Sequence, residues 1–380
     1  MMRDMILSNA RLVLADEVIE GTLYVVDGTI AAIDHGKSAN PAAMDCEGDL
    51  IIPGLIELHT DNLEKHFAPR PGVSWPALPA AVAHDAQLAT AGITTVFDAV
   101  CLGDIFAHSE RVQQLSCMID AICAGQRLGH FRADHFLHLR CELSYRYVID
   151  LFDEYAGNDL VGLVSLMDHT PGQRQFVDVE KYRQYYKKKW GLRDDALAAF
   201  TLEQNEAHDR YSRDHRKILV DKCHDRELPI ASHDDASIEH VQEAIVDGAV
   251  IAEFPTTLEA ARAAHKNDLK VLMGAPNLVL GGSHSGNISA MDLSRHGLLD
   301  IVSSDYVPSS LIHGLLRIAG EGGLALDKAI ALATVNPARA AGMEDRGEID
   351  AGKRADLVRV ATHDDFPRIV SVWRKGQRIV

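Results

Sequence analysis

Eight apolar, strand-like runs separated by helix-like intervals are the feature that most limits what this chain can fold into. Each run is short and is bounded by Gly, Pro or Asp turn signals. The runs are DLIIPGLIELHTD (49–61), GITTVFDAV (92–100), DHFLHLRCEL (134–143), LVGLVSLMDHT (160–170), LPIASHDD (228–235), AVIAEFPTT (249–257), KVLMGAPN (270–277) and LLDIVSSDY (298–306). This alternation predicts an α/β fold in which eight parallel strands and their helices form a (β/α)₈ TIM-like barrel.

Short strand-like runs also occupy both ends of the chain, and neither end can bury a core alone. They are MILSNARLVL, GTLYVVDG and TIAAID near the N-terminus, and RIVSVWRKGQRIV at the C-terminus. We therefore predict one small composite β-sandwich from residues 1–50 and 345–380. The barrel is predicted over residues 51–344. A segment near 171–225 is longer than a usual connection and predicts a helical excursion over the barrel mouth.

The charge and the cysteine content narrow the classes of function. The net charge is −17 over 380 residues, which argues against sequence-independent nucleic-acid binding because such binding depends on Lys and Arg meeting phosphates. The six cysteines form no CxxC pair, so reduced thiols are expected. No signal-like region and no run of membrane-spanning length is evident. We expect a cytoplasmic protein with no nucleic-acid or membrane partner, and homo-oligomer formation stays open.

Side chains that can bind metal ions recur at the ends of these strand-like runs. They are His59, Asp61, Glu142, His169, His233 and Asp305. A single strand-end His or Asp is more often a satisfied hydrogen-bonding group than a ligand. Six of them are hard to explain in that way, because the carboxyl ends of barrel strands meet at one face. The pattern predicts a metal site of three imidazoles and three carboxylates.

Strand parity and donor chemistry refine this prediction. Residues i and i+2 of a strand share a face, so His138, Arg140 and Glu142 are expected to point into the barrel while the alternating apolar residues face the helices. Imidazole and carboxylate donors without thiolate fit Zn²⁺, Fe²⁺ or Mn²⁺. Six ligands exceed the needs of one four-coordinate zinc, so we predict two divalent ions bridged by Glu142. Such a pair activates water and stabilises a reacting oxyanion.

One segment at the start of the barrel region and one in the C-terminal part of the predicted sandwich resemble the amidohydrolase superfamily. PGLIELHTD (53–61) resembles the first-strand motif PGxIDxHxH, with Asp61 in place of the second His, and GEIDAGKRADLV (347–358) resembles the C-terminal segment. A finer resemblance, to triphosphate diphosphatases of phosphonate breakdown, spans nearly the whole barrel; that family is expected to carry Asp at the position of Asp61. The matching stretches are PGLIELHTDNLEKHFAPRP, SLMDHTPGQRQF, ASHDDA, VIAEFPTTLEAARA, VLMGAPNLVLGGSHSGN and SSDYVPSSL.

The resemblance implies a metal-dependent hydrolase with a small phosphorylated ribose as its substrate. The implied reaction is hydrolysis of α-D-ribose 1-methylphosphonate 5-triphosphate to the 5-phosphate and pyrophosphate. Asp305 matches the superfamily's acid/base aspartate and would accept the proton of the attacking water. Related ring-amide hydrolases often bridge their metals with a carboxylated Lys. No Lys stands at an equivalent strand end here, so Glu142 is the natural substitute.

Cations must meet the charge that develops on a phosphoanhydride, and several side chains are candidates. Arg140 is the strongest, because an inward-facing barrel arginine needs an anionic partner. The other candidate substrate-binding residues are Arg174, Lys65, Arg70, His84, Ser283 and His284. The three other basic side chains equally fit solvated or loop-bracing roles, and the loop GGSHSGN is not a P-loop. KYRQYYKKKW (181–190) fits a solvated helix face better than a cationic lid.

Two pairs of neighbouring residues admit several interpretations. His84 and Asp85 fit an oriented imidazole near the site, which we favour slightly, or a satisfied pair at a helix start. Asp234 and Asp235 fit contact with a ribose hydroxyl, orientation of His233 or a helix cap, and the sequence does not separate these.

Two rival functions also stay open. One is a cyclic-amide hydrolase or deaminase on the same fold, against which Asp61, Arg140 and Arg174 argue because they suit anions better than neutral rings. The other is a non-catalytic amidohydrolase-like scaffold, which predicts eroded ligand positions, whereas all six are intact.

Overall fold

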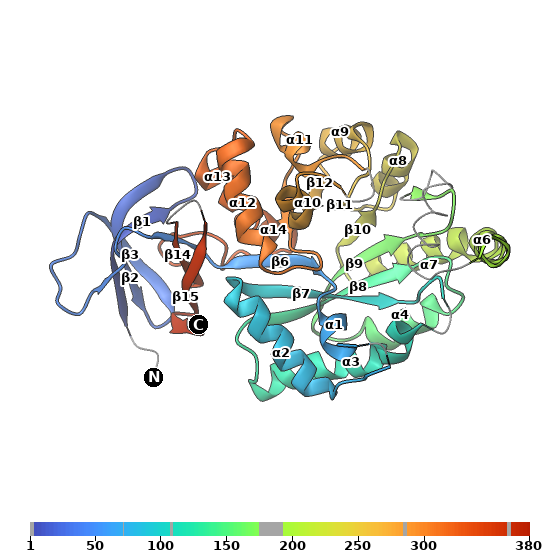
Figure 1. Ribbon diagram of the computed structural model, residues 1–380, viewed down its shortest axis with the longest axis horizontal. Coiled ribbons are helices and arrows are strands. Elements are labelled where there is room, and N and C mark those ends of the chain that lie inside the picture. The colour runs from blue at the N-terminus through green and yellow to red at the C-terminus, as the bar shows by residue number, and fades with distance from the viewer. Residues whose placement is uncertain (1–3, 71, 107–108, 175–192, 284–286, 363–365) are drawn as a thin grey trace.

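The computed structural model describes residues 4–70, 72–106, 109–174, 193–283, 287–362 and 366–380. Two eight-stranded sheets organise this part of the chain. One is a parallel barrel sheet, and the other is a mixed sheet built from both termini, which lies at one end of the molecule (Figure 1). The predicted (β/α)₈ architecture and the union of the two termini are therefore confirmed.

The barrel strands pair in chain order, and each neighbouring pair is parallel. They are β6 (Leu55–Thr60), β7 (Ile93–Leu102), β8 (Asp134–Glu142), β9 (Val161–Met167), β10 (Ile230–His233), β11 (Ile251–Glu253), β12 (Lys270–Gly274) and β13 (Ile301–Ser303). The last strand, β13, also contacts β6. Each predicted run contains one of these strands, as expected for apolar runs that are buried on both faces.

The first predicted run is the exception in one respect, because it contains two strands that belong to different sheets. β5 (Leu50–Pro53) pairs with the terminal sheet, and β6 begins the barrel. Gly54 lies between them, where an added Cβ would come within 2.2 Å of Thr94 Oγ1. Only glycine lets the backbone pass so close to the neighbouring strand.

Helices follow most of the barrel strands and cover the outside of the barrel (Figure 1). They are α1 (Leu63–Phe67), α2 (Ala77–Thr90), α3 (Glu110–Leu128), α4 (Val148–Tyr155), α6 (Asp194–Ala207), α7 (Arg213–Asp225), α8 (Ile238–Val246), α9 (Leu258–Lys266), α10 (Ala275–Leu280), α11 (Ala290–Arg295), α12 (Ser310–Glu321), α13 (Leu326–Ala331) and α14 (Val335–Ala340). Ser109, Ser237 and Thr257 cap α3, α8 and α9 by accepting a hydrogen bond from a backbone N–H of the first turn, as such residues commonly do. None of the helices described is both long enough and apolar enough to cross a bilayer.

The apolar face of β8 shows how the strands divide their side chains. Leu137, Leu139 and Cys141 pack with Ile119 of α3 and Phe152 of α4. His138 and Arg140 alternate with these residues and face the other way, towards residues of the barrel interior. The parity predicted for this strand is therefore confirmed.

Within the segment near 171–225, for which a helical excursion is predicted, the structure describes α6 and α7, which are joined by a π-helical turn (His208–Ser212). The basic segment 181–190 lies outside the described residues. Gln204 donates a hydrogen bond to the carbonyl of Ile105, and His215 donates one to the carbonyl of Leu143. These helices therefore pack against loops that follow β7 and β8, on the side to which those strands point (Figure 1).

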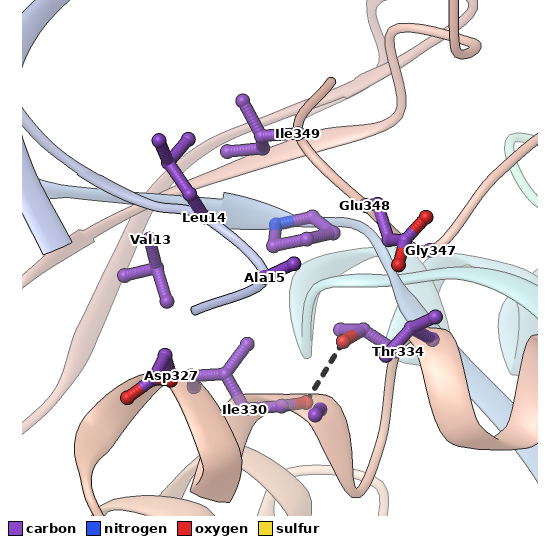
Figure 2. Close-up of a pocket in the computed structure, with 12 residues that line it drawn as sticks. Val13, Leu14, Ala15, Asp327, Ile330, Thr334, Gly347, Glu348 and Ile349 are labelled. Atoms are coloured by element: carbon purple, nitrogen blue, oxygen red, sulfur yellow. Dashed lines mark hydrogen bonds between the residues drawn. The ribbon is translucent and has the colours of Figure 1, made fainter. Parts of the chain in front are cut away.

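The terminal sheet has the order β16-β15-β14-β5-β1-β2-β3, with β4 beside β1. Its strands are β1 (Met5–Val13), β2 (Val18–Val26), β3 (Thr29–His35), β4 (Met44–Asp45), β5, β14 (Leu357–Ala361), β15 (Arg368–Arg374) and β16 (Gln377–Arg378). Figure 2 shows a small pocket where the end of β1 meets α13 and α14, lined by residues such as Val13, Ile330 and Thr334. The pocket contains none of the predicted site residues.

Candidate metal centre

Three strand ends of the barrel carry a non-glycine residue with a left-handed backbone. Asp234 follows β10 with φ 56°, Phe254 follows β11 with φ 51°, and Asp305 lies just beyond β13 with φ 52°. Such residues are uncommon and cluster at functional sites, because the surrounding structure must hold them in place. All three lie beside the imidazoles described next.

Four histidines gather at this face, and Glu253 at the end of β11 connects two of them. Glu253 Oε1 accepts a hydrogen bond from His59 Nδ1 at 3.0 Å, and Oε2 accepts one from His233 Nδ1 at 3.0 Å. Ser165 Oγ also donates to Oε2, at 2.6 Å, and contacts His138 Nε2. Because an ionised carboxylate only accepts hydrogen bonds, Nδ1 of His59 and His233 carries the proton and Nε2 is left as a lone pair.

His169 and Glu142 form the second half of the centre. Its Nδ1 donates to Glu142 Oε2 at 2.6 Å, and its ring centroid lies 5.7 Å from that of His233. Nε2 of His169 lies 3.9 Å from Asp234 Oδ2, and Nε2 of His233 lies 3.5 Å from the same oxygen. Burial raises the pKa of Asp234 to about 7, although the nearby His169 and Arg140 oppose the rise.

Asp61, Arg140 and Asp305 form the remaining side of the centre. Arg140 is buried, with Nη1 4.0 Å from Asp61 Oδ2 and Nε donating to Met167 Sδ at 3.3 Å. Burial, together with neighbouring Asp61, raises the pKa of Asp305 to about 6. The carbonyl of Asp305 accepts a hydrogen bond from Thr60 Oγ1 at 2.6 Å. A buried arginine without a carboxylate in direct contact is suited to an anionic ligand.

The structure therefore brings the six predicted ligand positions into one neighbourhood. These buried His, Asp and Glu side chains are consistent with a metal site; His169, His233 and Asp234 form one group of close donor atoms, and His59, His138 and Glu253 form another. Their donor atoms, imidazole nitrogen and carboxylate oxygen, fit a divalent transition metal.

The contacts of the other predicted substrate-binding residues differ from those of Arg140. Arg174 is buried and paired with Asp235 and Glu243, so carboxylates already neutralise its charge. Lys65 is exposed and donates to the carbonyl of Tyr306, next to Asp305. Arg70 is exposed and Ser283 is half-buried. His284 lies outside the described residues.

His84 belongs to a separate, fully buried cluster and is not paired with Asp85. Its Nε2 lies 2.7 Å from Asp98 Oδ1, and Asp98 Oδ2 accepts from His135 Nδ1 at 2.7 Å. Asp85 instead accepts from His135 Nε2 at 3.4 Å and from backbone N–H groups. The helix-start interpretation is also wrong, because both residues lie inside α2, which starts at Ala77. Asn62, which follows Asp61, connects this cluster to the site with Nδ2 3.1 Å from His84 Nδ1.

Sequence reasoning did not assign Glu253 or Ser165 to the site. The signal for Glu253 was present, because it ends the apolar run AVIAE at the point where other runs carry a ligand. Ser165 lies within a strand and carried no such signal.

A barrel with histidines and carboxylates at its strand ends is typical of metal-dependent hydrolases, and comparison with known proteins identifies the family. The chain belongs to the amidohydrolase family, whose model matches residues 177–379. Alpha-D-ribose 1-methylphosphonate 5-triphosphate diphosphatase of Escherichia coli (strain K12) is 49% identical over 377 residues, which cover 99% of this chain and 100% of that protein. Adenine deaminase of Ligilactobacillus salivarius (strain UCC118) is 24% identical, covering 96% of this chain and 55% of that protein.

Solved structures share the fold at low sequence identity. 5-Methylcytosine deaminase from Klebsiella pneumoniae, with phosphonocytosine, aligns with a TM-score of 0.66 and 16% identity over 99% of this chain and 98% of that chain. N-acetyl-D-glucosamine-6-phosphate deacetylase from Mycobacterium smegmatis aligns with a TM-score of 0.64 and 18% identity over 99% and 100% of the two chains.

Proposed function

We propose that this chain is a metal-dependent diphosphatase that hydrolyses α-D-ribose 1-methylphosphonate 5-triphosphate to the 5-phosphate and pyrophosphate, in phosphonate breakdown. The observation that carries the proposal is the 49% identity to the Escherichia coli diphosphatase over the full length of both chains. The buried Arg140 at the centre supports it, because a phosphoanhydride substrate supplies the anion that this guanidinium lacks.

The residues of the chain have separate roles in the proposed reaction. Arg140 binds an oxygen of the triphosphate and stabilises the charge that grows there. Asp305, with its pKa raised to about 6, accepts the proton of the attacking water near neutral pH and passes it to the leaving group. His59, Asp61, Glu142, His169 and His233 are candidate ligands. Two bound Zn, Fe or Mn ions would supply a Lewis acid and an activated water.

Lys65 and Arg70 are proposed to guide the anionic substrate from the rim, because both side chains are exposed. Exposed cations act mainly on encounter rates and are screened by salt. Arg174 is proposed only to brace its loop, since Asp235 and Glu243 already pair with it.

The test is product identification with metal-loaded protein. Incubation with the ribose 5-triphosphate, followed by ion chromatography, is expected to give equal amounts of 5-phosphate and pyrophosphate. Incubation with adenine, cytosine derivatives and a cyclic imide tests the rival chemistry. Ammonia release or ring opening, without any pyrophosphate from the triphosphate, would replace the proposed function by the deaminase or cyclic-amide hydrolase alternative.

A further inference from the structure

The carboxylates of Asp234, Glu142 and Glu253 have different contacts, and the difference separates a ligand from the groups that orient ligands. We propose that Asp234 is a metal ligand together with His169 and His233, while Glu142 and Glu253 act as positioning residues through those two imidazoles. This inference deepens the proposed function, because it assumes that the centre holds a metal ion.

Three donor atoms already face one another. Asp234 Oδ2 lies 3.5 Å from His233 Nε2 and 3.9 Å from His169 Nε2, and all three donors lie within 4.8 Å of one another. Donor atoms around a four-coordinate zinc, each ~2.1 Å from the ion, lie roughly 3.4 Å apart. The three atoms therefore fit one face of a tetrahedral site with little movement of the side chains.

Each of the two imidazoles has its other nitrogen occupied. His169 Nδ1 donates to Glu142 at 2.6 Å, and His233 Nδ1 donates to Glu253 at 3.0 Å. A carboxylate that holds one ring nitrogen fixes the tautomer and makes the opposite nitrogen a better ligand. The Nε2 atoms that remain, one on each ring, are the two that lie 3.5 Å and 3.9 Å from Asp234 Oδ2.

The carboxylate of Asp234 is buried, and the described residues offer it no hydrogen bond. Its side chain is 7% exposed, and it accepts no hydrogen bond from any residue that the structure describes. A buried carboxylate is costly unless it is paired, and neither Nε2 atom makes a hydrogen bond to it. A cation between the three atoms would resolve this.

Glu142 differs because both of its oxygens are engaged. Oε1 accepts from Ser144 Oγ at 3.0 Å and from the backbone N–H of His169 at 3.1 Å, while Oε2 accepts from His169 Nδ1. A bridging role, as the sequence suggested, requires these bonds to be exchanged for metal ligation. The geometry favours orientation of His169 instead.

Metal binding by matched variants tests the proposal without any substrate. Apo protein, Asp234→Asn and Glu142→Gln are titrated with Co²⁺ against a chelator, and the visible spectrum is recorded. Asp234→Asn is expected to lose at least ~100-fold in affinity for one ion and to change the spectrum, because a ligand is lost. Glu142→Gln is expected to lose about 10- to 100-fold with the spectrum unchanged, as for an outer-shell partner.

The reverse pattern, with a changed spectrum in Glu142→Gln and wild-type binding in Asp234→Asn, overturns the assignment. Anomalous diffraction from metal-loaded wild-type crystals needs no variant to fold: an Asp234 oxygen about 2.1 Å from an ion supports the proposal, and an ion that contacts Glu142 but not Asp234 refutes it. Pyrophosphate release is assayed separately, so metal binding with the predicted ligands but no diphosphatase activity would count against the proposed function alone.

Discussion

At the residue scale, the two buried arginines near the site differ in the carboxylates that contact them. Arg174 has two carboxylate partners, whereas Arg140 has one carboxylate oxygen at 4.0 Å. Both are candidates for phosphate binding on sequence grounds, and among the described residues no carboxylate oxygen lies nearer to the guanidinium of Arg140 than that of Asp61. The difference depends on which carboxylates the fold places beside each arginine.

Arg140→Met is therefore expected to weaken productive binding of the triphosphate. Loss of a charge-assisted hydrogen bond predicts a fall of roughly 10- to 100-fold in kcat/KM. Arg140→Lys keeps the charge but loses the planar fork, so an intermediate value is expected. Steady-state kinetics on folded variants checks this. Equal kcat/KM values for Arg140→Met and the wild type would exclude Arg140 from substrate binding.

Glu253→Gln is expected to lower metal affinity about 10- to 100-fold, because the amide cannot accept from both imidazoles as the carboxylate does. Competition with a chelator measures this. Ser165→Ala is the matched control, since it removes a donor to Glu253 without touching either histidine, and a smaller loss is expected. A greater loss in Ser165→Ala than in Glu253→Gln would contradict the role assigned to the carboxylate.

At the element scale, the cluster of His84, Asp98 and His135 holds helix α2 against strands β7 and β8. Each of the three side chains is completely buried, and both carboxylate oxygens of Asp98 are engaged. Burial opposes a charge on His135, but Asp98 and Asp85 outweigh it and raise the pKa of His135 to about 9. The cluster therefore joins the elements through a buried ion pair.

Asp98→Asn is expected to destabilise the fold by about 3 kcal/mol, because it removes the nearer of the two carboxylates that pair with the buried His135. Urea unfolding followed by circular dichroism measures the loss. Glu321→Gln on the surface of α12, which breaks the exposed pair with Arg317, is the control and is expected to cost about 0.5 kcal/mol or less.

The same pair predicts a pH dependence of stability. The pKa of His135 is about 9 in the folded chain, against an ordinary value of 6.5, so its stabilisation is complete below about pH 6.5 and is lost as the pH rises through about 9. The free energy of unfolding of the wild type should therefore fall between about pH 7 and pH 9.5. A slope just as steep in Asp98→Asn would show that another group is responsible.

Much of the element order could be predicted from the sequence, because apolar runs between turn residues mark buried barrel strands. The division of the first run between two sheets could not be predicted, because β5 and β6 are both apolar and only Gly54 separates them. The six predicted ligand positions could be identified as polar residues at strand ends. The contacts of Asp234, Glu142 and Glu253 could not be predicted, because they depend on the orientation of the imidazole rings and on strands that are far apart in the sequence.

At the scale of the whole molecule, the terminal sheet and the barrel are joined far from the candidate metal centre. Asp134, at the start of β8, accepts from Arg354 Nη2 at 2.7 Å, Arg346 Nη1 at 3.0 Å and Arg374 Nη1 at 3.1 Å. All three arginines come from the C-terminal part of the chain. The site residues of β8 lie at its other end, beside α7 (Figure 1).

Asp134→Asn should lower the free energy of unfolding by about 3 kcal/mol, because three arginines lose one buried anion. The kcat of the diphosphatase reaction should stay within about twofold, since the change lies at the opposite end of the strand. Thermal unfolding and steady-state kinetics check the two halves of the prediction. A large loss of kcat without loss of stability would mean that the terminal sheet influences the site directly.

The central claim is that one phosphoanhydride bond is cleaved to release pyrophosphate, and ³¹P NMR of the reaction tests it most directly. During turnover of the ribose 5-triphosphate by metal-loaded protein, we expect the three triphosphate resonances to be replaced by one pyrophosphate resonance and one 5-phosphate resonance. The phosphonate resonance should persist. Stepwise appearance of inorganic phosphate, or an unchanged triphosphate spectrum with fully metal-loaded protein, would contradict the account.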